Sequence, residues 1–136
     1  MKNKAKIKKF FTGEQGLAEV IDNYSPRSAQ IEMATAIAES IDNEEHVIVE
    51  AGTGTGKTFA YLVPALLSGK KVIVSTGTKN LQDQLFNKDI PLIQRALTQP
   101  FEAALLKGRA NYLCTYRLEI SMQSNFSGSR EEAADL

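Results

Sequence analysis

The residues with the clearest chemistry stand in one short stretch, Ala51-Gly52-Thr53-Gly54-Thr55-Gly56-Lys57-Thr58. Alternating glycines let a backbone turn tightly and bring its N–H groups against phosphate oxygens, where a Cβ would obstruct them. We expect Lys57 to reach the terminal phosphates of a nucleotide as a flexible charge, and the Thr58 hydroxyl to take a Mg²⁺ coordination position. The stretch therefore predicts a phosphate-binding loop with Lys57 and Thr58 as its catalytic residues.

The loop departs from the usual pattern at its first position, where Ala51 stands in place of glycine. Alanine is the next smallest residue, so the loop can form if this position has a negative φ. An ordinary Gly/Thr-rich turn is the other interpretation. It is disfavoured because the sequence predicts a strand directly before the loop and a helix directly after it.

The elements that must position this loop are predicted as strands and helices in alternation. Residues 47–50 and 72–75 are short runs rich in valine and isoleucine, typical of parallel strands buried on both faces. A third strand is expected at 101–106, with helices over 57–68, from about 79 to 86, and again from about 89 to 97. This order predicts an α/β fold with a parallel sheet, right-handed crossovers and flanking helices.

The segment ahead of the loop is predicted to contain two further helices. The first spans residues 12–22, and the second spans about 26–42 with an apolar stripe along one side. Residues 1–11 are lysine-rich, and we expect them to be a solvated basic tail. The alternative is an arm that makes weak contacts with phosphates. The stripe of the second helix comprises Ile31, Ala34, Ile37, Ala38 and Ile41.

Composition limits the class of protein. The chain has 136 residues and a formal net charge of zero, so it suits one domain and any nucleic-acid site must be local. One cysteine excludes an internal disulfide framework and fits a reducing compartment. No apolar run approaches the roughly 20 residues of a membrane span. We therefore expect a cytoplasmic protein with no membrane partner.

Two further groups of residues flank the loop. An amide such as that of Gln30 can recognise the edge of adenine with two hydrogen bonds, and Arg27 stands three residues before it. Thr76 and Thr78 follow the second predicted strand and lead into a helix, so their hydroxyl and N–H groups can face a bound backbone. A surface glutamine and an ordinary strand–helix turn are the simpler interpretations of these two groups.

A third segment, Lys107-Gly108-Arg109-Ala110-Asn111-Tyr112-Leu113-Cys114, completes an ordered set. Together with Arg27-x-x-Gln30, the phosphate loop and Ser75-Thr76-Gly77-Thr78, it resembles the N-terminal part of DinG/XPD-type iron–sulfur DNA helicases of superfamily 2. The resemblance is greatest to their YoaA-like branch and covers residues 13–114. It implies a RecA-like ATP-binding domain over 12–106, and the start of an iron–sulfur domain, cut short, over 107–136.

The resemblance also implies an activity. It implies a 5′-to-3′ DNA helicase of repair or replication that uses ATP and Mg²⁺ and tracks single-stranded or forked DNA through Thr76 and Thr78. Arg27 and Gln30 would face the base, and Cys114 would be one of four ligands of a [4Fe–4S] cluster. This sequence has one cysteine, so the cluster would belong only to a full-length protein.

Other departures bear on turnover. No apolar strand followed by Asp-Glu occurs in the sequence, so the carboxylates that hold Mg²⁺ and activate water in such motors are missing. We therefore expect the chain to be incomplete and to bind ATP without hydrolysing it. The alternatives are a non-catalytic product that binds nucleotide or DNA, and an unrelated P-loop NTPase or kinase.

Overall fold

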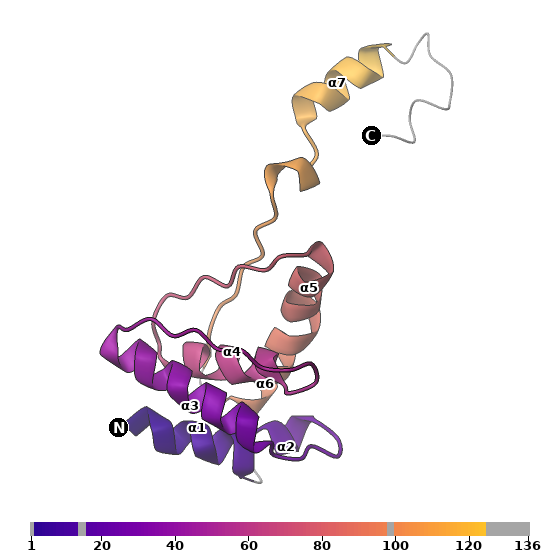
Figure 1. Cartoon of the computed structure of the whole chain (residues 1–136). Coiled ribbons are helices and arrows are strands. Elements are labelled where there is room, and N and C mark those ends of the chain that lie inside the picture. The colour runs from indigo at the N-terminus through magenta and orange to yellow at the C-terminus, as the bar shows by residue number, and fades with distance from the viewer. Residues whose placement is uncertain (1, 14–15, 98–99, 125–136) are drawn as a thin grey trace. The chain divides into compact units, whose positions relative to one another are not determined.

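The structure is a computed structural model that describes residues 2–13, 16–97 and 100–124. The chain divides into two compact units, Met1–Ala104 and Leu105–Leu136. The first unit holds the phosphate loop and most of the helices (Figure 1). Its helices are α1 (Lys2–Thr12), α2 (Leu17–Val20), α3 (Ser28–Asn43), α4 (Lys57–Leu67), α5 (Lys79–Gln84), the π-helix η1 (Leu85–Asp89) and α6 (Ile90–Ala96).

Helix α3 packs most extensively on α4, and the two form the centre of the first unit. Ala34 and Ala38 of the predicted apolar stripe are buried there, and small side chains at a helix contact let the two axes approach closely. Helices α1, α2, η1 and α6 close the remaining sides. The buried core comprises Ile7, Phe10, Phe11, Leu17, Ala34, Ala38, Ala60, Leu62, Val63, Leu85 and Ile93.

The N-terminal segment differs from the basic tail expected for residues 1–11. It forms helix α1, and this helix packs against α3, α2 and α4. Ile7 and Phe11 are 1% and 0% exposed, so the helix contributes two of the largest fully buried side chains. The lysines concealed an apolar spacing of i, i+3 and i+4 at Ile7, Phe10 and Phe11, which is the signal of an amphipathic helix.

The predicted parallel sheet is wrong for this structure, because none of the described residues forms a strand. Residues 47–50 and 72–75 are non-helical, and neither belongs to a ladder of strand hydrogen bonds. Ile48 and Ile73 are 99% and 96% exposed, whereas the valines on either side of each are about two-fifths exposed. The apolar runs therefore have one side turned toward the helices and the other toward solvent, and no strand pairs with them. Residues 101–106 likewise form no strand.

The predicted helices next to the loop are confirmed with small shifts. The helix expected over 57–68 is α4, which passes through Pro64 and ends before Gly69 at a left-handed φ of 68°. Pro64 has no N–H to donate to the Ala60 carbonyl, so the helix continues past it with one backbone hydrogen bond fewer. The predicted 12–22 helix is reduced to the single turn of α2, and α3 begins at Ser28 because Arg27 is still extended.

The second unit contains a 3-10 turn, η2 (Arg109–Asn111), and helix α7 (Thr115–Ser124). The Lys107 amide donates to the Tyr112 hydroxyl at 2.9 Å, and the Asn111 side chain donates to the Gly108 carbonyl at 3.1 Å. Residues 125–136, the end of the segment 107–136 assigned to the start of an iron–sulfur domain, lie outside the described residues. Within the part of the chain that is described, no helix is long and apolar enough to span a bilayer.

Candidate functional site

The phosphate loop is a turn that depends on two glycines. Gly54 and Gly56 have φ values of 76° and 78°, in the left-handed region that side chains other than glycine rarely adopt. Ala51 is not among the described residues with positive φ, so alanine meets the condition set for that position. Gly56 is also the N-cap of α4 and no side chain caps that end, so the first N–H groups of α4 point toward the loop without a side-chain acceptor.

Lys57 folds back over the loop. Its Nζ donates to the carbonyl oxygens of Ala51 and Gly52, each at 2.7 Å, and the Thr55 hydroxyl donates to the same Gly52 oxygen at 3.0 Å. The ammonium group therefore lies within the curve of the backbone. Nearby N–H groups, a helix N-terminus and one positive charge are thus brought together, and each of them attracts an anion.

Gln30 is hydrogen-bonded to the last residue of the loop before Lys57. Its side chain is 3% exposed, and its Nε2 donates to the Gly56 carbonyl at 3.0 Å while its Oε1 accepts from the Tyr24 hydroxyl at 3.0 Å. A Cβ added to Gly56 would lie 2.1 Å from that Nε2. The structure thus brings Gln30 to the phosphate loop, and both ends of its amide are engaged by protein groups there.

Arg27 lies beside this pair as the extended residue that precedes α3. Burial raises the pKa of Tyr24, and the positive charge of Arg27 opposes this by favouring the phenolate. Arg27, Tyr24 and Gln30 therefore form one group at the start of α3, of which the sequence predicted Arg27 and Gln30.

Thr58 is connected to a buried carboxyl through Tyr61. Burial raises the pKa of the Tyr61 hydroxyl, a hydrogen bond with Thr58 lowers it, and the charge of Asp89 raises it further. Asp89 is 8% exposed and accepts from Gln84 Nε2 at 3.2 Å. Burial raises the pKa of Asp89, while the Gln84 hydrogen bond and the Lys88 charge oppose that shift.

The two threonines predicted to contact DNA start helix α5. The Thr78 hydroxyl accepts from the Leu81 amide at 3.2 Å as an N-cap, and Thr76 donates to the Thr78 carbonyl at 3.3 Å. The cap uses one lone pair of the Thr78 oxygen, so the hydroxyl proton can still be donated to another acceptor. The turn expected at this position is present, although the strand expected before it is not.

Cys114 is exposed and directly precedes α7 in the second unit. No group of three or more potential metal ligands occurs among residues 2–13, 16–97 and 100–124. A [4Fe–4S] cluster needs four thiolates, and the chain has one. These residues therefore do not fit the cluster by themselves.

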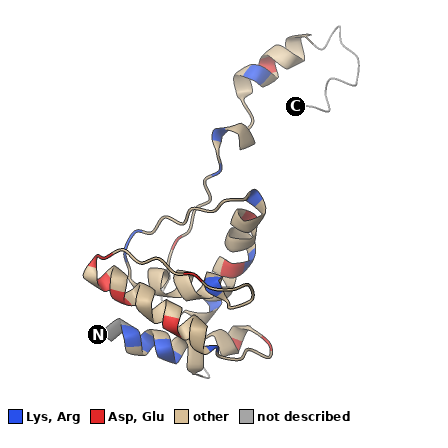
Figure 2. Cartoon of the chain, viewed as in Figure 1, with Lys and Arg blue, Asp and Glu red and all other residues tan. Residues whose placement is uncertain are grey.

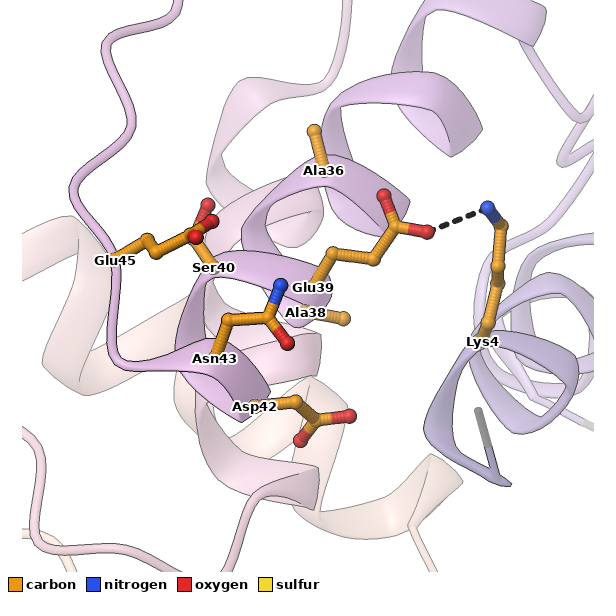
Figure 3. Close-up of a pocket in the computed structure, with 8 residues that line it drawn as sticks. All are labelled: Lys4, Ala36, Ala38, Glu39, Ser40, Asp42, Asn43 and Glu45. Carbon is orange, nitrogen blue, oxygen red and sulfur yellow. Dashed lines mark hydrogen bonds and ion pairs between the residues drawn. The ribbon is translucent and has the colours of Figure 1, made fainter.

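A hollow of about 400 Å³ lies apart from the phosphate loop, between α1 and the C-terminal half of α3 (Figure 3). Lys4 reaches across it to Glu39, with an Nζ–Oε1 distance of 2.6 Å, and Asp42 and Glu45 stand along the same side. None of the residues predicted for the site lines this hollow. Its acidic rim makes it a poor place for a nucleotide phosphate.

Sequence reasoning missed three residues that support the site. Tyr24 was part of the segment containing Gln30, but a hydroxyl six residues away follows no periodic pattern. Tyr61 and Asp89 meet only because η1 packs against α4. The π-helix turns Asp89 inward, and local propensity does not predict such a bulge.

Comparison with known proteins identifies a family over the part of the chain that contains the loop. The family model described as DEAD/DEAH box helicase matches residues 27–111, from the start of α3 to the end of η2. That range contains Gln30, the phosphate loop, Thr76 and Thr78.

Individual relatives match over a still longer range. The chain is 51% identical over 130 residues to the ATP-dependent DNA helicase YoaA of Haemophilus influenzae, covering 96% of this chain and 20% of the relative. It is 52% identical over 109 residues to YoaA of Escherichia coli, covering 80% and 17%. It is 42% identical over 110 residues to a Bacillus subtilis protein named 3'-5' exonuclease DinG, covering 78% and 12%.

The chain thus spans about a fifth or less of the length of these relatives, and the activities in their names differ. Each of these matches is long enough to include the phosphate loop. Because the family match takes in more than half of the chain, and includes the whole phosphate loop, this protein belongs to the DEAD/DEAH box helicase family.

Proposed function

We propose that this chain is the N-terminal, ATP-binding portion of an ATP-dependent 5′-to-3′ DNA helicase acting in DNA repair or replication. The observation that supports this most directly is the loop itself. Gly54 and Gly56 are left-handed, α4 begins without a side-chain cap, and Lys57 lies within the curve of the backbone. Each is a feature that phosphate binding requires. Its membership of a helicase family extends that chemistry to a motor.

ATP binding would proceed by exchange of partners. The Lys57 ammonium would leave the carbonyls of Ala51 and Gly52 for phosphate oxygens, while the N–H groups of residues 51–58 and the start of α4 would hold the phosphates. Thr53 and Thr55 would lie along this curve. An ion–ion contact with phosphate replaces an ion–dipole contact with carbonyls, so the exchange is favourable.

Base recognition would use Gln30 and Arg27. For Gln30 to reach the adenine edge, its Nε2 would have to release the Gly56 carbonyl, because both ends of the amide are engaged. Recognition of the base would thereby be coupled to the shape of the phosphate loop. Tyr24 would keep the Gln30 oxygen oriented during the exchange.

Mg²⁺ would be held in part by the Thr58 hydroxyl, with Tyr61 orienting that group through their hydrogen bond. Mg²⁺ commonly keeps several waters and takes few protein ligands, so a single hydroxyl fits such a site. When bound, the ion would neutralise charge on the phosphates. The sequence supplies no Asp-Glu pair after an apolar run, so we expect ATP binding without turnover from these 136 residues.

DNA would be contacted through the turn that starts α5, by the Thr76 and Thr78 hydroxyls. The partner we propose is single-stranded or forked DNA, and the location is the cytoplasm. In a full-length protein, Cys114 would supply one thiolate of a [4Fe–4S] cluster whose other ligands are not in this chain.

The test is ATP binding by the purified chain, measured by calorimetry with Mg²⁺ present. Lys57→Ala should weaken binding by about 1.5–3 kcal/mol, since it removes a charged hydrogen-bond donor. Lys71→Ala is the control, because Lys71 is an exposed lysine that lies beyond α4 and outside the phosphate loop. Unchanged binding in Lys57→Ala would refute the phosphate loop.

Hydrolysis and specificity separate this proposal from its alternatives. ATP binding without hydrolysis, and preferred over GTP in a Gln30-dependent way, is the expected result. Phosphoryl transfer to a small acceptor, with no response to DNA, would identify an unrelated P-loop kinase instead.

A further inference from the structure

Helix α1 carries a dense and unbalanced positive charge. The helix contains Lys4, Lys6, Lys8 and Lys9 with exposed side chains, and its sequence Lys2–Thr12 has no acidic residue. In Figure 2 its ribbon is marked blue repeatedly and nowhere red. The whole chain has a net charge of zero, so this is a local concentration of charge and not a general property.

This arrangement costs the helix stability. Lys4 stands in the first turn, where a positive charge opposes the helix dipole. Lys4 with Lys8, and Lys6 with Lys9, are like charges at i, i+4 and i, i+3, which repel across the helix surface. Only Lys4 has an ion pair among the described residues of α1, to Glu39 beside the acidic hollow. Lys6, Lys8 and Lys9 have no ion pair among the described residues, and of the three only Lys9, in the last turn, suits the helix dipole.

The opposite side of the helix restricts the kind of partner. Ile7, Phe10 and Phe11 are buried in the core, so α1 has no apolar face to insert into a lipid bilayer. The side of α1 that can contact a partner therefore carries mainly charged groups, and the helix that holds them is packed on the core. Lys6 and Lys9 are neighbours on the helix surface and Lys8 stands next to Lys9, so the three exposed ammonium groups share the solvent-facing part of the helix.

We propose that Lys6, Lys8 and Lys9 form a sequence-independent contact with the phosphate backbone of DNA. The contact lies outside the range matched by the helicase family model, which begins at residue 27. It rests on the proposed function for the identity of the anionic partner. Its role is to hold DNA on the motor without reading bases, as phosphate contacts do elsewhere.

The test measures binding of the full chain to a labelled single-stranded oligodeoxynucleotide over a range of KCl concentrations. The variant Lys6→Gln/Lys8→Gln/Lys9→Gln should lower the slope of log affinity against log salt by about 2, because each neutralised phosphate adds about 0.7 to that slope. The control Lys71→Gln/Lys88→Gln/Arg95→Gln removes the same charge from exposed positions elsewhere and should leave the slope unchanged.

Two further measurements make the outcome decisive. ATP binding should be the same in the α1 variant as in the wild type, and its melting temperature should be equal or higher because like charges are removed. An unchanged salt slope, or an equal loss in the control, would overturn the contact. Tighter binding of the wild type to phosphatidylserine vesicles than to DNA would assign the lysines to a membrane surface instead. If the wild type binds neither ATP nor DNA, it is the proposed function that fails.

Discussion

Gly56 is the residue at which the loop and its support meet. Its φ of 78° already excludes most side chains, and the Gln30 amide stands where a Cβ would be. Gln30 is buried and bonded at both ends, so it can move aside only by losing the hydrogen bonds to Tyr24 and Gly56. The position is constrained twice, once by backbone conformation and once by contact.

This double constraint gives the first prediction. Gly69 has a φ of 68°, and a Cβ added there would have nothing within 4 Å. Gly69→Ala should therefore lower the free energy of unfolding by the backbone strain alone, about 1–3 kcal/mol. Gly56→Ala should lower the free energy of unfolding by more than this, and the variant should also bind ATP less tightly. Urea unfolding measures the first effect and calorimetry the second.

Combining the substitutions isolates the contact. In Gly56→Ala/Gln30→Ala the collision is removed, so the sum of the single losses should exceed the loss of the double variant. Additive losses would show that Gln30 does not press on Gly56.

At the scale of elements, α1 belongs to the core, and the segments around Ile48 and Ile73 do not. Phe11 is 0% exposed among α3- and α4-facing side chains, whereas Ile73 is 96% exposed. Two apolar residues of similar character therefore have opposite surroundings. Local composition alone would predict the opposite burial, because Phe11 follows a lysine-rich run and Ile73 lies within an apolar run.

The second prediction compares these two positions by urea unfolding. Phe11→Ala should lower the free energy of unfolding by about 3–5 kcal/mol, because it removes a buried ring and leaves a cavity. Ile73→Thr should change it by less than about 0.5 kcal/mol, as exposed substitutions do. If Phe11→Ala lowered the free energy of unfolding only slightly, α1 would not be part of the core.

The π-helix η1 supports a third prediction, on pH. Burial raises the pKa of Asp89, so the fold favours the neutral carboxyl. The protonated Asp89 carboxyl therefore contributes fully to stability below the ordinary pKa of an aspartate. This contribution is lost as the pH rises through the raised pKa of Asp89 in the folded state. Asp89→Asn keeps the shape and the acceptor for Gln84 without the charge.

The variant Asp89→Asn should therefore unfold at a higher urea concentration than the wild type at pH 7, and the difference should shrink as pH falls toward about 4. Asp22→Asn, at an exposed turn position, is the control and should show little difference at either pH. A difference that grows at low pH would show that Asp89 is stabilised as a carboxylate.

At the scale of the whole molecule, the sequence predicted the position and backbone conformation of the loop better than it predicted the fold. Gly54, Gly56 and Lys57 carry their chemistry in residue type and spacing, so the loop could be found without a structure. The strands could not be tested in the same way, because a strand exists only through hydrogen bonds to another strand. The apolar character of 47–50 and 72–75 predicted burial, and the structure leaves one side of each run uncovered.

The supporting contacts were beyond the sequence for a similar reason. Tyr24 with Gln30, and Tyr61 with Asp89, meet only when helices are packed, and nothing in either pair's spacing announces the contact. The helices themselves were predicted well where caps and stops were explicit, as at Thr78 and Gly69. They were predicted poorly where lysines concealed an apolar stripe, as in α1.

The uncovered runs have a consequence for how the chain behaves in solution. Backbone N–H and C=O groups of an apolar, extended, unpaired segment are a template for pairing with another chain. Near its isoelectric point of about 6.6 the chain also lacks the net repulsion that keeps copies apart.

The fourth prediction follows from this. Sedimentation should show reversible, concentration-dependent self-association, and Ile48→Lys/Ile73→Lys should suppress it. Asn80→Lys/Asn87→Lys adds the same charge at exposed positions without removing apolar surface, and should suppress it less. Pairing of the uncovered runs, and not the stability of the helical core, would then set the highest protein concentration at which this chain stays monomeric.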